Sequence, residues 1–179
     1  MNETEFRQKL KELLKGEFGN EYNVEENKNL IYKVIIDENL KYEPSDPRNP
    51  KRGDYAFQTD IAIVKREGNL PLVIIETKYG AFSSHDVLTY STKALRHKEI
   101  YPYIRYGLVV GGEDKIDNRF FVHNVGLDFA IAIEKIDEAD LKRLSTIIRE
   151  QLESAKLLLD IFVKKKKVKE FNSVIEIKT

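Results

Sequence analysis

The chain has 179 residues, which suits one domain, and its 41% hydrophobic and 34% charged residues allow a packed core and do not indicate disorder. It contains no cysteine, which excludes disulfides and thiolate chemistry. It has no apolar run long enough for a membrane span or a secretory signal, so we expect a cytoplasmic protein without a membrane partner. Lys and Arg total 30, as do Asp and Glu, so a DNA-binding surface would require local segregation of charge.

The first third of the chain is predicted to hold a helix, a strand and a long loop. Residues 4–18 place apolar side chains on one helical face, and Gly16 and Gly19 mark the end of this amphipathic helix. Residues 29–37 are rich in β-branched and aromatic side chains and are predicted to form a strand. Residues 38–54 contain three prolines and are predicted to form a loop, of a length that is more often functional or mobile.

The middle of the chain is predicted to form a hairpin followed by a helix. A strand that begins near residue 55 runs into a turn at residues 67–69, and PLVIIETKYG, residues 71–80, is the returning strand. Ser83 or Ser84 is expected to cap a helix that continues to about Lys98.

The remaining elements complete a mixed α/β sheet with helices on its faces. Residues 105–112 are predicted to form a short apolar strand, and residues 119–135 to supply one or two more. Asp137 is expected to cap a long C-terminal helix, and residues 163–179 are basic and then strand-like. The predicted buried stripe of the long helix consists of Leu141, Leu144, Ile148, Leu152, Ala155, Leu159 and Phe162.

Charged residues end the apolar strand and point to one face of it. Glu76 and Lys78 share a face because side chains alternate along a strand, and pairing with the preceding strand brings Asp60 close to Glu76. Two neighbouring carboxylates repel each other, and a divalent cation between them removes that repulsion. Mg²⁺ favours such a site and lowers the pKa of a bound water, while Lys78 can orient that water or neutralise charge. The residues therefore predict a phosphodiester hydrolase.

A Glu-x-Lys sequence at a strand end is also common as a solvated ion pair worth less than ~1 kcal/mol. The position of Asp60 in the preceding strand and the apolar run before Glu76 favour the catalytic interpretation. Asp54 competes with Asp60 but ranks second, since it lies outside the apolar strand.

With Asp60 in FQTDIAIV and Glu76-Thr77-Lys78 in VIIETKYG, residues 3–112 resemble the PD-(D/E)XK nuclease superfamily. The order of helix, three strands, crossover helix and strand is similar too. The resemblance implies a restriction-endonuclease-like fold, Mg²⁺ or Mn²⁺ held by Asp60, Glu76 and the Thr77 carbonyl, and Lys78 as the catalytic lysine. Thr59 stands where the family name has proline, and many members are similar in this respect.

Further site residues come from the two helices and the long loop. Many members of the family carry a glutamate on the first helix that faces the site, and we choose Glu3 over the competing Glu5, Glu12 and Glu17. An acid favoured by the helix dipole explains Glu3 equally well. The predicted contacts with DNA are Lys51, Arg52, Tyr90 and Lys93, each of which also suits a solvated surface.

The sequence therefore predicts a Mg²⁺-dependent endodeoxyribonuclease that binds DNA. The resemblance also implies a homodimer, for which the long helix is one interface, although a stripe of this kind is more often core. A module with the same fold that binds nucleic acid without cutting it is an alternative. A plain α/β protein with a surface Glu-Lys pair is another, and it requires that Asp60, Glu76 and Lys78 do not converge.

Overall fold

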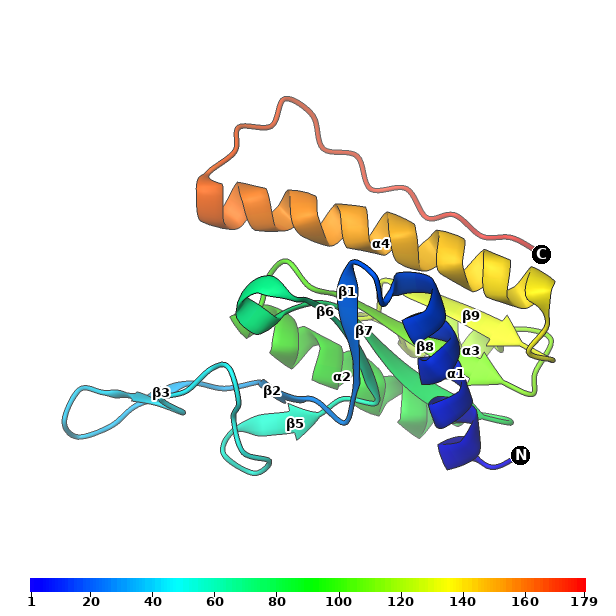
Figure 1. Ribbon diagram of the computed structural model, residues 1–179, viewed down its shortest axis with the longest axis horizontal. Coiled ribbons are helices and arrows are strands. Elements are labelled where there is room, and N and C mark those ends of the chain that lie inside the picture. The colour runs from blue at the N-terminus through cyan, green and yellow to red at the C-terminus, as the bar shows by residue number, and fades with distance from the viewer.

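The computed structural model describes residues 1–179 and confirms a mixed α/β architecture with a central sheet, flanking helices and a long C-terminal helix (Figure 1). No helix combines the length and the apolar character that crossing a bilayer requires. The elements, in chain order, are α1 (Glu3–Phe18), β1 (Tyr22–Glu26), β2 (Asn29–Ile31), β3 (Ile35–Ile36), β4 (Tyr42–Glu43), β5 (Ala56–Gln58), β6 (Ile61–Lys65), the 3₁₀ turn η1 (Glu67–Asn69), β7 (Leu70–Tyr79), α2 (Ser84–Ile100), β8 (Arg105–Gly111), α3 (Asn118–His123), β9 (Phe129–Ile133) and α4 (Glu138–Lys164).

The central sheet has five strands in the order β1-β6-β7-β8-β9. The pairs β1–β6 and β6–β7 are antiparallel, whereas β7–β8 and β8–β9 are parallel. The middle strand, β7, is buried from Pro71 to Thr77, which explains its continuous apolar sequence. The predicted hairpin is the β6–β7 pair, and β7 holds Glu76 and Lys78 at the centre of the molecule.

Helices cover both faces of this sheet, and Figure 1 shows α2 and α4 on opposite sides of it. On one face, the Phe6 ring of α1 lies 5.5 Å from the Tyr79 ring of β7. On the other face, Lys93 of α2 reaches Glu76 of β7. The side chain of Glu76 therefore faces α2, while that of Tyr79 faces α1.

The secondary structure differs from the prediction in three places. The strand predicted at residues 29–37 is split into β2 and β3, because residues 32–34 leave the ladder. The edge strand β1 was not predicted, since only Tyr22 and Val24 are buried in it. Residues 118–123 form the helix α3, which was not predicted and which Asp117 caps through the Arg119 amide, while β9 is the strand predicted within residues 119–135.

The C-terminal region also differs in part from the prediction. Asp137 caps α4 as predicted, and Leu144, Ile148, Leu152 and Ala155 are buried. Leu141 and Leu159 are only partly buried, and Phe162 is 54% exposed, because the last turns of α4 extend past the sheet (Figure 1). In the tail predicted as basic and then strand-like, residues 163–179, the helix α4 continues to Lys164, and the remainder forms no strand because no other segment pairs with it.

A separate ribbon interrupts the chain between β1 and β6. The antiparallel pairs β2–β5 and β3–β4 lie outside the central sheet. Figure 1 shows this segment extending far beyond the body of the protein. We call residues 29–58 the arm. The loop predicted at residues 38–54 forms most of it, with β4 as a short strand inside.

Candidate functional site

The antiparallel register of β6 and β7 brings two carboxylates to the same level of the sheet. Ile61 pairs with Ile75, and Asp60 and Glu76 are each the next residue beyond that pair. Asp60 is therefore opposite Glu76 at the point where the chain leaves the arm and β6 begins. The fold thus places side by side the two acids that the sequence predicts to be partners.

Asp60 is fixed to the strand that carries Glu76. Its Oδ2 atom accepts hydrogen bonds from the Thr77 amide at 2.8 Å and from the Thr77 hydroxyl at 2.9 Å. Its Oδ1 atom lies 3.3 Å from Nη1 of Arg7, whose Nε donates to Glu26 at 2.8 Å. The Asp60 side chain keeps 21% of its surface exposed, so a ligand can reach it.

Glu76 is almost completely buried, with 2% of its surface exposed. Its Oε1 atom accepts a hydrogen bond from the Tyr106 hydroxyl at 2.6 Å and lies 2.8 Å from Nζ of Lys93. Burial raises the pKa of Glu76, and the charge of Asp60 adds to this, while Lys93 acts in the opposite direction. A buried carboxylate whose neighbour is also acidic is a site where a second cation would be favourable.

Lys78 lies between the first turns of two helices. Its Nζ atom is 3.5 Å from Oε2 of Glu3 and 3.6 Å from Oδ1 of Asp86. Asp86 is held by Ser83, which caps α2 and exchanges hydrogen bonds with it. Burial alone would raise the pKa of Asp86, but the Ser83 hydrogen bonds and the Lys78 charge outweigh it and lower that pKa. The acids in contact with Lys78 are therefore Glu3 and Asp86, and not Asp60 or Glu76.

The structure separates the predicted acids from their competitors. Glu3 pairs with Lys78, whereas the other glutamates of α1 have partners elsewhere: Glu5 with Asn2, Glu12 with Lys11 and Glu17 with Arg149. Asp54, the competitor of Asp60, is exposed in the arm. There it helps line a surface hollow of about 400 Å³, which has no basic residue in its lining and lies between the β3–β4 hairpin and residues 53–55.

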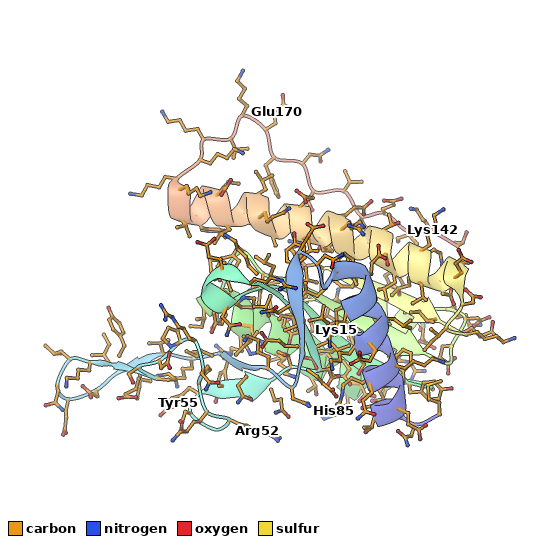
Figure 2. The ribbon with its side chains drawn as sticks, in the orientation of Figure 1. Lys15, Arg52, Tyr55, His85, Lys142 and Glu170 are labelled. Carbon is orange, nitrogen blue, oxygen red and sulfur yellow. The ribbon has the colours of Figure 1, made fainter.

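The four residues predicted to contact DNA fall into two groups. In the first group, Lys93 forms an ion pair with Glu76. Tyr90 is half-buried near Glu76, and its pKa is raised mainly by burial and also by the charges of Glu76 and other acids. Lys51 and Arg52 are exposed in the arm just before β5. Figure 2 shows Arg52 near β5, at the base of the arm. Only the first group lies beside the carboxylates.

Three residues of the site were not predicted from the sequence. Tyr106 reaches Glu76 because β7 and β8 are parallel in a register that pairs Ile74 with Tyr106. Arg7 lies one helical turn after Glu3 on α1, so the four-residue spacing was a signal for it. Asp86 follows Ser83 by three residues, which is the spacing of a capping box.

The donor atoms fit a magnesium ion that keeps several waters. No group of three acidic or histidine side chains forms a ready cage, but Mg²⁺ is usually bound by one or two carboxylates with waters. The Thr77 amide faces Asp60, and the amide and carbonyl of one strand residue point to the same edge, so the Thr77 carbonyl faces that edge as well. No hydrogen bond reaches Oε2 of Glu76, which leaves it available to a cation.

Comparison with known proteins gives no assignment for this chain. A scan against protein-family models finds no match. A search of curated proteins finds no similar sequence. A functional interpretation therefore depends on the residues and the geometry of the chain itself.

Proposed function

We propose that this protein is a metal-dependent nuclease of the restriction-endonuclease-like kind that hydrolyses DNA phosphodiester bonds. The observation that carries the proposal is the placement of Asp60 opposite Glu76, with Thr77 bonded to Asp60 and Lys78 following on the face of Glu76. A solvated Glu-Lys pair at a strand end requires neither the second carboxylate nor the burial of the first.

Each residue has a role in this proposal. Asp60, Glu76 and the Thr77 carbonyl would hold Mg²⁺ or Mn²⁺, which supplies a bound water of lowered pKa and neutralises charge on the phosphate. Tyr106 fixes Glu76 through the 2.6 Å hydrogen bond. Lys78, whose Nζ lies 3.5 Å from Glu3, orients the attacking water or neutralises the phosphate. A cytoplasmic location and a homodimer that cuts both strands belong to the same proposal.

One observation favours the alternative of a module that binds nucleic acid without cutting it. Arg7 lies 3.3 Å from Asp60, and Lys93 lies 2.8 Å from Glu76, so protein cations already neutralise both carboxylates in part. In such a module the cluster of charges would hold β6, β7 and α2 together without a metal. The two candidates differ in what they predict for DNA in the presence of Mg²⁺.

Cleavage of a supercoiled plasmid distinguishes the two candidates. We expect the wild-type protein to nick or linearise it with Mg²⁺ or Mn²⁺, and Lys78→Ala and Glu76→Gln to be slower by about 100-fold or more. Lys65→Ala is the matched control, because Lys65 lies on the adjacent strand β6 and its side chain is 51% exposed in a surface ion pair. It should cut at the wild-type rate.

Binding without cleavage under any divalent metal would favour the alternative. Two results would overturn the nuclease proposal. The first is a wild-type protein that neither binds nor cuts DNA. The second is cleavage at a rate that Lys78→Ala and Glu76→Gln leave unchanged.

A further inference from the structure

The arm leads directly into the strand that positions Asp60. Its last strand, β5, ends at Gln58, and only Thr59 separates it from Asp60. The amide and the hydroxyl of Thr59 both donate to the Lys28 carbonyl, at 2.9 and 3.0 Å. The base of the arm is therefore continuous with the strand beside the carboxylate pair, while the tip lies farther away (Figure 1).

The base of the arm is anchored to the body of the protein. His97 of α2 hydrogen bonds to the Leu30 carbonyl at 3.1 Å, and the Tyr101 hydroxyl accepts from the Ile31 amide at 3.3 Å. The Tyr32 and Phe57 rings stack with their centroids 3.9 Å apart. These contacts give the base a fixed direction while the rest of the arm projects into solvent (Figure 1).

The arm carries basic residues without partners in the chain. Each is exposed and none forms an ion pair: Lys33, Lys41, Arg48, Lys51 and Arg52. Its acids are equal in number, but Asp37 and Asp46 bind backbone amides within the arm. The three remaining acids are Glu38, Glu43 and Asp54. Because a carboxylate that accepts amide hydrogen bonds keeps its charge, the arm is neutral overall, and its basic residues stand out only in that none has a partner in the chain.

The tip of the arm exposes large apolar side chains that nothing in the chain covers. Ile36 is 61%, Leu40 85% and Tyr42 67% exposed. Such side chains cost solubility, and on a projecting hairpin they mark a contact surface. A mixture of apolar, basic and acidic groups suits base edges, since thymine offers a methyl group, guanine accepts from Arg or Lys, and cytosine donates to Glu or Asp.

We infer that the arm is the element that recognises duplex DNA, entering the major groove beside the phosphate that the Asp60–Glu76 site cuts. This inference rests on the proposed nuclease function and names its substrate as double-stranded DNA. The major groove of B-DNA admits a two-stranded β-ribbon, whereas the major groove of duplex RNA is too narrow for side chains to read. Lys51 and Arg52, near the base, contact the DNA backbone, while the tip reaches the bases.

The test compares two triple variants in binding to a short DNA duplex without divalent metal, which prevents cleavage. The arm variant is Arg48→Ala/Lys51→Ala/Arg52→Ala, and the control is Lys115→Ala/Lys135→Ala/Lys142→Ala, whose residues are also exposed and unpaired. Figure 2 shows Lys142 on α4, far from the arm. Fluorescence anisotropy over a range of salt concentrations gives the affinity and its salt dependence. A third variant, Ile36→Ser/Leu40→Ser/Tyr42→Ser, tests the tip.

We expect the arm variant to bind at least 10-fold more weakly, and its slope of log affinity against log salt to fall by about 1 for each phosphate that the variant no longer neutralises. The tip variant should bind more weakly with an unchanged slope, and the control should behave as wild type. The inference would be overturned if the arm variant bound the DNA duplex with wild-type affinity and slope, or if the control lost as much affinity as the arm variant. It would also be overturned if the wild-type protein bound single-stranded DNA or duplex RNA more tightly than duplex DNA.

The outcomes separate this inference from the nuclease proposal. A wild-type protein that cuts plasmid DNA with Mg²⁺, together with an arm variant that binds normally, would reject the arm and keep the nuclease. A wild-type protein that binds duplex DNA through the arm but does not cut it would reject the nuclease and keep the arm.

Discussion

Replacing Lys93 with Met tests whether a metal ion belongs beside Glu76. Nζ of Lys93 lies 2.8 Å from Oε1 of Glu76, and the two side chains are 17% and 2% exposed. Removal of one partner of a buried ion pair costs about 3–5 kcal/mol. Tyr106 still donates to Glu76 in the variant, so we expect a value near the lower end, about 3 kcal/mol.

A bound divalent cation should return part of this stability. At about 2–4 °C per kcal/mol for a domain of this size, Lys93→Met should lower the melting temperature by about 6–12 °C without metal. Mg²⁺ or Mn²⁺ held by Glu76 and Asp60 would replace the missing positive charge and would bind the variant more tightly. The stabilisation by a ligand grows with its concentration relative to its Kd, so the metal should raise the melting temperature of the variant more than that of wild type.

Thermal unfolding with and without Mn²⁺ measures this difference, and Lys98→Met is the matched control. Lys98 is on the same helix, and its Nζ lies 2.8 Å from Asp128, with side chains 23% and 11% exposed. Lys98→Met should also be less stable than wild type, but Mn²⁺ should raise its melting temperature only as much as that of wild type. A metal site at Glu76 would be refuted if Mn²⁺ raised the melting temperature of Lys93→Met only as much as that of wild type, or only as much as that of Lys98→Met.

Two further changes test the surroundings of the site. Tyr106→Phe removes a hydrogen bond to a charged, buried carboxylate, and we expect urea denaturation to show a loss of about 1.5–3 kcal/mol; an unchanged free energy of unfolding would contradict the hydrogen bond. Burial lowers the pKa of His97 to about 4, so the unfolded chain, with a pKa near ~6.5, takes up a proton first. This part of the stability is complete above pH ~6.5 and is lost as the pH falls toward the folded pKa, by about 2 kcal/mol between pH ~7 and ~5. His97→Gln should lose less stability than wild type over that range, and parallel losses in the two proteins would show that His97 is not buried in its neutral form.

The local part of the site was predictable from the sequence. The apolar runs on both sides of the turn at residues 67–69 define the β6–β7 hairpin, which places Asp60 near Glu76. Alternation along β7 places Glu76 and Lys78 on one face. The choice of Glu3 on α1 depended on the family resemblance as well, because helical periodicity alone does not separate Glu3 from Glu17.

The long-range part of the site was not predictable. The contact of Tyr106 with Glu76 depends on the register of two parallel strands joined by a helix, and no local pattern encodes that register. The contact of Lys93 with Glu76 depends on how α2 lies across the sheet. The sequence alone therefore suggested Lys93 as a phosphate ligand and showed no sign of its ion pair with Glu76.

The arm illustrates the same limit. Its sequence at residues 38–54 indicates a loop through three prolines, but the short pairs β2–β5 and β3–β4 that turn it into a ribbon involve only two or three residues per strand. Strands this short leave no periodicity to detect. The β2–β5 pair also joins the two ends of the arm, Asn29 to Gln58, across the whole intervening segment, so no local signal marks the partner of either strand.

The most direct test of the account is the location of a bound cation. We propose an anomalous-scattering measurement on crystals of the protein grown with Mn²⁺ and a short DNA duplex. The account predicts a peak within coordination distance of Asp60 and Glu76, with Lys93 displaced from at least part of its contact with Glu76. A map without a peak at these carboxylates, with Lys93 still bound to Glu76 and Arg7 to Asp60, would contradict it.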